Sequence, residues 1–189
     1  MISPAIERCP WCGDDELYVR YHDEEWGKKV TSDTVLFEFL VLESAQAGLS
    51  WITILRRREG YRQAFARFDY KQVALFDQHK IEELVQDAGI IRHRGKIEAA
   101  IRNAQIFMQI QEEFGSFYNY LYSFMPEQKS ITNSLKDIGS APTHSDESDA
   151  IAKDLKKRGM KFFGTTICYA YMQAVGMVND HLDSCSFKN

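Results

Sequence analysis

The sequence predicts an all-α fold, and three observations favour it. Apolar residues recur at three- and four-residue spacing over most of the chain, which is typical of amphipathic helices. Glycines and prolines stand where such helices would end. No segment alternates apolar and polar residues convincingly enough to indicate a strand. With 189 residues, 44% of them hydrophobic, the chain can bury one sizeable core or two small lobes that share one.

The first predicted helices have recognisable starts and stops. One begins at Ser32 or Asp33, either of which is a good N-cap residue, and runs to Gly48, a glycine typical of helix C-termini. Ser50 is placed to cap a second helix, which we expect to continue through residues 51–65.

The middle of the chain predicts two short helices and one long one. Asp69 and Asp77 each precede a short helical segment, and Gly89 closes the second of them. The longest helix is expected at 95–114, where apolar residues repeat at helical spacing. The aromatic segment 117–124 is short and is expected to lie in the core.

The C-terminal third predicts a helical hairpin. Residues 126–147 are polar, contain two prolines and indicate an irregular connection. Helices are expected near 149–158 and 165–176. Between them, Gly159 can end the first helix in a left-handed conformation, and Gly164 lets a backbone or a phosphate approach closely as the second helix begins.

The net charge of −4 does not by itself suggest a nucleic-acid partner, but basic residues cluster locally. Residues 56–67 contain five arginines against one acid, Glu59, and residues 153–161 contain five lysines and arginines against Asp154. A third cluster, at 92–96, contains no acid. Each cluster taken alone is more typical of a solvated helix face than of a phosphate site.

The predicted hairpin resembles the helix-hairpin-helix element of DNA repair glycosylases. Exposed N–H groups and the helix dipole at the start of its second helix favour phosphate binding beside basic side chains. Such contacts position a duplex without reading its sequence. The predicted DNA contacts are Arg158, Gly159, Lys161, Gly164 and Thr165. The alternative is a plain helical hairpin with its apolar residues in the core.

The chain offers neither a signal peptide nor a long apolar segment. No stretch of 18 uncharged apolar residues occurs, so we expect no membrane span, and a cytoplasmic location follows by default. Four cysteines in such a chain argue against a disulfide framework and leave metal binding or free thiols. A monomer is the simplest expectation.

Two pairs of metal-type ligands stand at opposite ends of the sequence. Cys9 and His22 lie near the N-terminus, while His181 and Cys185 lie near the C-terminus. A Cys2His2 set is a standard closed, tetrahedral, structural zinc site. The His-x3-Cys spacing predicts that the second pair shares one face of a helical turn. Such a site would fasten two segments that otherwise fray. Spacing alone also allows a set in which Cys12 replaces His22.

Glu43 is the most unusual residue of the first predicted helix. It stands near the helix C-terminus, where the dipole disfavours a carboxylate. An acid at this position therefore indicates a specific role. A lone acid among aromatic rings suits a flat, cationic base that carries an amino group, because the rings face its π-surface and the acid accepts from the amino group. Guanine presents a carbonyl oxygen at that edge and would be repelled. The nearby aromatic residues are Trp11, Tyr18, Tyr21, Trp26 and Trp51. In the alternative, Glu43 lies on the surface and the aromatic residues form core.

Sequence blocks spread from Cys9 to Cys185 resemble the bacterial 3-methyladenine DNA glycosylase I family. They are RCPW, YHDEEWG, LESAQAGLSWITILRRRE, DAGIIRHRGKI, GTTICYAYMQA and VNDH. The resemblance implies a single unit over 1–189, with a helix-hairpin-helix at about 148–176 and a zinc-bearing lobe formed by the N- and C-terminal segments. It selects the ligand set that includes His22 and leaves Cys12 spare. It also implies a base pocket made of Glu43, Tyr18, Tyr21, Trp51, Trp11 and Trp26.

The resemblance further implies a monofunctional enzyme of base excision repair. Such an enzyme flips 3-methyladenine out of alkylated double-stranded DNA, hydrolyses its N-glycosidic bond and releases the free base. Glu43 would be the catalytic residue and Leu49 a wedge in the vacated base stack. Two other classes stay open: a non-catalytic, zinc-stapled DNA-binding module, and a zinc hydrolase for small molecules that keeps an open coordination position.

Overall fold

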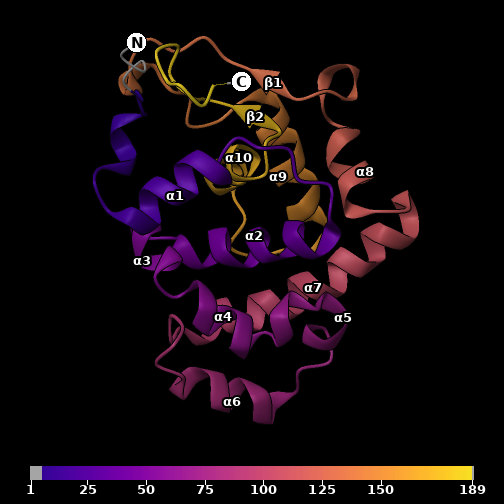
Figure 1. The fold of residues 1–189 in the computed structure, drawn as a ribbon. Helices are drawn as coiled ribbons and strands as arrows, with labels where there is room; N and C mark the ends of the chain where they lie inside the picture. Colours follow the sequence, from indigo (N-terminus) through magenta and orange to yellow (C-terminus); the bar gives the residue numbers. More distant parts are fainter. Residues whose placement is uncertain (1–5, 189) are drawn as a thin grey trace.

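The computed structural model describes residues 6–188, which are mostly helical, as predicted. Figure 1 shows α7 crossing beneath α2, with α4, α5 and α6 at the far end from the two termini. The helices are α1 (Glu16–Glu24), α2 (Asp33–Gln46), α3 (Trp51–Leu55), α4 (Arg58–Ala64), α5 (Tyr70–Val73), α6 (Gln78–Gln86), α7 (Arg94–Phe114), α8 (Phe117–Tyr122), α9 (Asp146–Arg158) and α10 (Thr165–Ala174). Within residues 6–188, no helix is long and apolar enough to cross a membrane.

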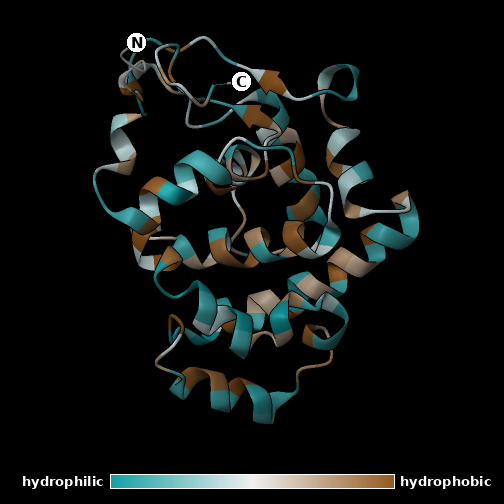
Figure 2. Ribbon diagram, in the orientation of Figure 1, coloured by the Kyte–Doolittle hydropathy of each residue, from teal (hydrophilic) through white to brown (hydrophobic). Residues whose placement is uncertain are grey.

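Helix α2 is the central element of the core. It packs against both α7 and α10, and every residue from Leu36 to Ala45 is buried. Apolar residues follow α2 along much of its length in Figure 2, as expected of a helix covered on all sides. Two acids, Glu38 and Glu43, are nevertheless buried within it. Because buried acids are rare without a partner, each needs an explanation from its surroundings.

The segment 51–65, predicted as one helix, forms two. Helix α3 ends at Leu55, and α4 begins at Arg58. The Arg58 guanidinium lies 2.6 Å from the carboxylate of Glu38 on α2 and 2.7 Å from that of Glu25, which follows α1. These ion pairs fix the start of α4 against other helices. The spacing of apolar residues within 51–65 gives no information about such contacts with distant residues. They also give buried Glu38 its partner.

Three further elements were absent from the prediction: one helix and two short strands. Helix α1 is capped by Asp15, whose carboxylate accepts hydrogen bonds from the N–H groups of Leu17 and Tyr18. Strand β1 (Ile131–Thr132) pairs in parallel with strand β2 (Val178–Asn179). The short β1 lies inside the connection 126–147 that was predicted to be irregular.

Helices α9 and α10 form the predicted hairpin. Ser145 and Ser148 make a capping box, so α9 starts at Asp146, earlier than predicted. Gly159 ends α9 with a φ of +99°, the left-handed conformation expected of a C-terminal glycine. The hairpin packs against α2 through α10.

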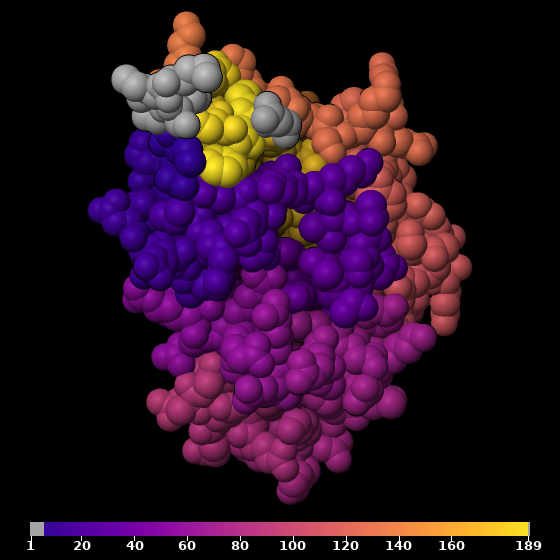
Figure 3. Space-filling view, viewed as in Figure 1, coloured from indigo at the N-terminus to yellow at the C-terminus, as the bar shows by residue number. Residues whose placement is uncertain are grey.

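The two ends of the described chain lie side by side (Figures 1 and 3). The Ser186 N–H donates to the Glu7 carbonyl at 2.9 Å, and the Glu7 N–H donates to the Ser186 hydroxyl at 3.0 Å. A small apolar cluster, separate from the main core, lies at this junction and contains Cys9, Leu135, Leu182 and Cys185. The N- and C-terminal segments are therefore in direct contact with each other.

Candidate functional site

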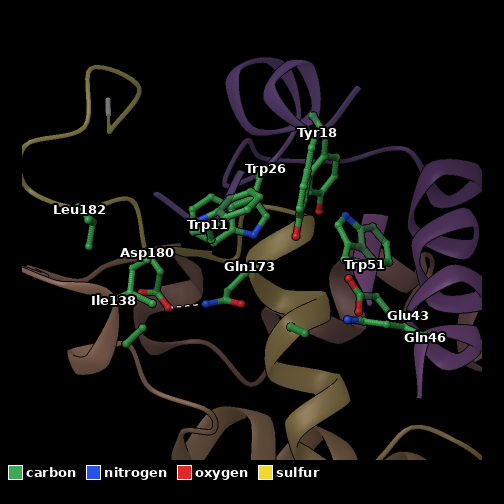
Figure 4. A pocket seen from close by; sticks show the side chains of 13 residues that line it. Trp11, Tyr18, Trp26, Glu43, Gln46, Trp51, Ile138, Gln173, Asp180 and Leu182 are labelled. Atoms are coloured by element: carbon green, nitrogen blue, oxygen red, sulfur yellow. Dashed lines mark hydrogen bonds between the residues drawn. The ribbon is translucent and has the colours of Figure 1, made fainter. Parts of the chain in front are cut away.

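A cavity of about 290 Å³ lies between α1, α2, α3 and α10 (Figure 4). All six residues predicted to form a pocket line it: Trp11, Tyr18, Tyr21, Trp26, Glu43 and Trp51. They come from α1, α2, α3 and the turns around α1. The fold thus brings together residues that are up to 40 positions apart in the sequence.

Glu43 is buried in the cavity wall without a partner. Its side chain is 3% exposed, and its Oε2 atom accepts no hydrogen bond within the part of the chain that the structure describes. Burial raises the pKa of Glu43 to about 8, which favours the neutral carboxylic acid at pH 7. The indole N–H of Trp51 likewise has no partner there. Unpaired buried polar groups beside a cavity are typical of a site that awaits a polar ligand.

The aromatic rings of the cavity hold one another in place. The ring centroids of Trp11 lie 5.1 Å from Tyr18 and 4.9 Å from Trp26, and Tyr21 lies 5.5 Å from Trp51. In Figure 4, Trp11 and Trp26 lie on one side of the cavity, while Trp51 and Glu43 lie on the other. The spacing of these pairs is that of attractive aromatic contacts, so the walls are preformed.

Three polar residues at the cavity were not predicted: Gln46, Gln173 and Asp180. In contrast to Glu43, the Asp180 carboxylate is fully paired. It accepts from Asn133 at 2.7 Å, from Tyr169 at 2.8 Å and from Gln173 at 2.7 Å. Since α10 and β2 are far from α2 in the sequence, no local pattern links these residues to Glu43.

The predicted metal ligands Cys9, His22, His181 and Cys185 form one buried group, whose candidate ligand atoms all lie within 4.8 Å of one another. The Nδ1 atom of His181 lies 3.6 Å from the sulfur of Cys9 and 3.3 Å from that of Cys185, and the His22 Nε2 atom lies 3.5 Å from the latter. A tetrahedral zinc ion would hold sulfur and nitrogen ligands about 3.6 Å apart. Cys12 lies outside the group and donates its S–H to the Cys9 carbonyl.

The surroundings of this Cys/His cluster also fit a metal ion. His22 Nδ1 lies 2.7 Å from the Asp23 carboxylate, and His181 Nε2 lies 3.2 Å from the Trp26 carbonyl. Such outer contacts orient the ring nitrogens that bind metal. Burial lowers the pKa of His181 to about 4, so its ring is neutral and able to bind. Burial also raises the pKa of Cys9 to about 12, so a nearby cation is needed to ionise this thiol.

The predicted helical turn at residues 181–185 is wrong. The tail after β2 is not helical, and the Cys185 N–H closes a tight turn on the Leu182 carbonyl at 2.9 Å. This turn, rather than a helix face, brings His181 and Cys185 together. A three-residue spacer suits both geometries, so spacing alone did not distinguish them.

The cavity and the Cys/His cluster share a wall. The Trp11 ring lies 5.2 Å from the His22 ring, and the Trp26 ring lies 4.7 Å from the His181 ring. Both indoles also line the cavity. The cluster therefore supports two of the rings that shape the cavity.

The hairpin residues predicted to contact DNA differ in how they are used. Arg158 is engaged within the protein, because its guanidinium lies 2.6 Å from each of Glu113 and Asp154, and this argues against a phosphate contact by its side chain. The Thr165 hydroxyl is bonded to the Asp149 carboxylate, which ties α10 to α9. A Cβ atom added to Gly164 would meet nothing within 4 Å, so space is open at the start of α10.

Lys161 has an exposed side chain and a firmly held backbone. Its N–H donates to the Asn103 side chain at 3.1 Å, and its carbonyl accepts from the same side chain at 3.0 Å. Asn103 lies on α7 and is fully buried, yet the sequence analysis did not single it out. Its position as a polar residue within the apolar repeat of α7 could have indicated that it binds another segment. Leu49, the predicted wedge, is 40% exposed in the loop between α2 and α3.

Comparison with known proteins gives a consistent family. The sequence profile of a family described as methyladenine glycosylase matches residues 11–189. DNA-3-methyladenine glycosylase 1 of Escherichia coli K12 is 50% identical over 180 residues, which cover 95% of this chain and 96% of the relative.

Solved structures agree with this similarity. A crystal structure of 3-methyladenine DNA glycosylase I is 47% identical, with a TM-score of 0.92 over 95% of this chain and 98% of the other. A structure of the Staphylococcus aureus 3-methyladenine DNA glycosylase I, which describes recognition of 3-methyladenine, is 34% identical, with a TM-score of 0.93 and 98% of both chains covered.

Proposed function

The chain belongs to the methyladenine glycosylase family, and on that premise we propose that it hydrolyses the N-glycosidic bond of 3-methyladenine in alkylated DNA. One observation carries the proposal beyond family membership. A single unpaired carboxyl group, Glu43, is buried in a cavity walled by aromatic rings. This arrangement suits a flat, positively charged base with an amino group.

Recognition follows from the chemistry of the cavity. A base flipped out of the duplex stacks against the indole and phenol rings, while Glu43 accepts from its exocyclic amino group. Burial by itself raises the pKa of Glu43 to about 8, which favours the protonated form at pH 7. A cationic base favours the ionised carboxylate, since a nearby opposite charge lowers the pKa of an acid. Binding of the damaged base therefore releases the proton of Glu43.

Bond cleavage needs little acid catalysis here. N3-methylation leaves the base cationic, so the bond between C1′ and N9 breaks with its electron pair moving to the base. Ionised Glu43 then stabilises the positive charge that develops on the sugar. Water attacks C1′ and loses a proton. No lysine lines the cavity in the described part of the chain, which fits hydrolysis without a Schiff base.

The proposed metal role is structural. Cys9, His22, His181 and Cys185 would hold a zinc ion and so fasten the N-terminal arm to the C-terminal tail. When bound, the ion would supply four strong ligand bonds and no catalytic chemistry, because four protein ligands leave no position for water. That closed set argues against a zinc hydrolase. The unpaired acid in the cavity argues against a non-catalytic DNA-binding module.

The proposed DNA partner lies against the hairpin. Lys161 offers an exposed ammonium group, and the open space at Gly164 admits a phosphate beside the N-terminus of α10. Leu49 projects from the loop that joins the Glu43 helix to Trp51, where a wedge would enter the space left by the flipped base.

Release of bases from methylated duplex DNA tests the proposal directly. The protein is incubated with DNA treated with a methylating agent, and the liberated bases are separated by chromatography. We expect free 3-methyladenine, with no strand cleavage and no base from untreated DNA. A folded protein that releases no base would contradict the proposed function.

A further inference from the structure

We propose that the turn of residues 91–96, which leads into α7 and includes its first three residues, is an additional DNA contact in which Arg92 binds a backbone phosphate. The inference rests on the proposed function, because it assumes a duplex lying on the hairpin. It extends that function by adding a surface on α7 to the hairpin and to the Leu49 loop.

The turn lies between these two elements and contacts both. On one side, the ring of His93 packs edge-on against the hairpin residue Phe162, with centroids 5.9 Å apart. On the other side, the Lys96 ammonium donates to the Ala45 carbonyl at 2.9 Å and to the Ala47 carbonyl at 2.7 Å. The turn is therefore continuous with the end of α2 and with the hairpin.

The two arginines of the turn differ in whether they have a partner within the protein. Arg92 is exposed and makes no ion pair or side-chain hydrogen bond within residues 6–188. Its neighbour Arg94 is paired with Glu82 at 2.6 Å, and Arg158 in the hairpin is paired twice. An arginine without a protein partner keeps all its donors for a ligand, and a phosphate accepts two of them side by side.

The exposed residues of the two flanking elements suit a nucleic acid rather than a protein. Leu49 and Phe162, one on each flanking element, are 40% and 39% exposed. Lys161 adds a second cation next to Phe162. Isolated apolar side chains separated by cations complement a duplex, in which apolar groups enter the base stack and cations meet phosphates.

Removing the positive charge of Arg92 tests its contact with a phosphate. Binding to a duplex with a stable abasic-site analogue is measured at several salt concentrations for the unchanged protein, Arg92→Gln and Arg67→Gln. Arg67 is the matched control: it is exposed, makes no ion pair or side-chain hydrogen bond in residues 6–188, and precedes α5. Arg67 also lies far from Arg92 along α7. The hydroxyl of Tyr70, three residues after Arg67, accepts a hydrogen bond from Gln111, which is about 25 Å along α7 from residue 94.

We expect Arg92→Gln to weaken duplex binding about eight-fold at 0.1 M salt and to reduce the slope of log K against log salt by about 0.9. Arg67→Gln should leave the duplex affinity and the salt slope unchanged. Inhibition of base release by free 3-methyladenine should be equal in all three proteins, because the cavity is the same in each. An unchanged slope for Arg92→Gln, or an equal loss in both variants, overturns the contact. Failure of the proposed function is distinct, because the unchanged protein would then release no base from methylated DNA.

Discussion

The cavity and the Cys/His cluster share two indole rings but treat polar groups in opposite ways. In the cluster, the ring nitrogens of His22 and His181 that face away from the sulfurs have a carboxylate or a carbonyl partner. In the cavity, Glu43 and Trp51 each keep an unpaired polar atom. Unpaired buried groups lower stability and are kept where a ligand pairs with them. We infer that the cluster serves stability and that the cavity serves binding.

Glu43→Gln should have the largest effect, and it should lower activity without lowering stability. Glutamine has the same shape but cannot carry the negative charge, so we expect the rate of 3-methyladenine release to fall about 10³-fold. The melting temperature should not fall. An exposed acid, as in Glu59→Gln, is the control and should keep full activity. Near-normal release by Glu43→Gln would remove the cavity from the mechanism.

Cys185→Ser should lower stability much more than activity. Loss of one ligand of the proposed zinc site should lower the free energy of unfolding by about 4 kcal/mol and the melting temperature by about 10 °C. Activity at a temperature where the variant is folded should fall much less than for Glu43→Gln.

Cys12→Ser is the matched control for the ligand change, because Cys12 lies next to the cluster without belonging to it. Metal analysis should find one zinc per chain in the unchanged protein and in Cys12→Ser. Absence of zinc from both, or equal melting of Cys185→Ser and Cys12→Ser, would contradict the structural role.

The effect of pH on stability provides a finer test of the unpaired acid. Burial raises the pKa of Glu43 from 4.5 to about 8. Between these values the unfolded chain has lost the Glu43 proton and the folded protein keeps it, so this group lowers stability as the pH rises. At pH 7 the penalty is about 3 kcal/mol, and Glu43→Gln removes it.

Glu43→Gln should therefore exceed the unchanged protein in stability by an amount that grows from pH 5 to pH 8. Denaturant unfolding at a series of pH values measures the difference. A difference that is constant across this range would show that Glu43 is not held neutral in the folded protein.

The parts of the fold that follow local rules were predictable from the sequence. The N-cap at Asp77, the left-handed glycine at Gly159 and the apolar repeat of α7 each act within one or two helical turns. Glu43 also stood out in the sequence, since a carboxylate near a helix C-terminus conflicts with the dipole, but its burial in a cavity did not follow from that position. The assembly of its aromatic neighbours into one cavity was expected from the family resemblance and not from spacing.

The parts that depend on distant contacts were not predictable. The break before Arg58 follows ion pairs with Glu25 and Glu38, and the pairing of β1 with β2 joins segments about 47 residues apart. Asn103 orders the hairpin backbone from another helix. A pattern within one segment contains no information about these partners.

The position of the Cys/His cluster also determines the order of events during synthesis. Cys9 and His181 are 172 residues apart, so the first pair of ligands leaves the ribosome long before the second pair has been made. Helices α2 and α7 can pack earlier, because chains fold from the N-terminus as they emerge. The ring of ligands closes last, and with it the wall made by Trp11 and Trp26. An unfinished copy of the chain, which lacks Asp180 and Leu182, therefore lacks part of the cavity wall.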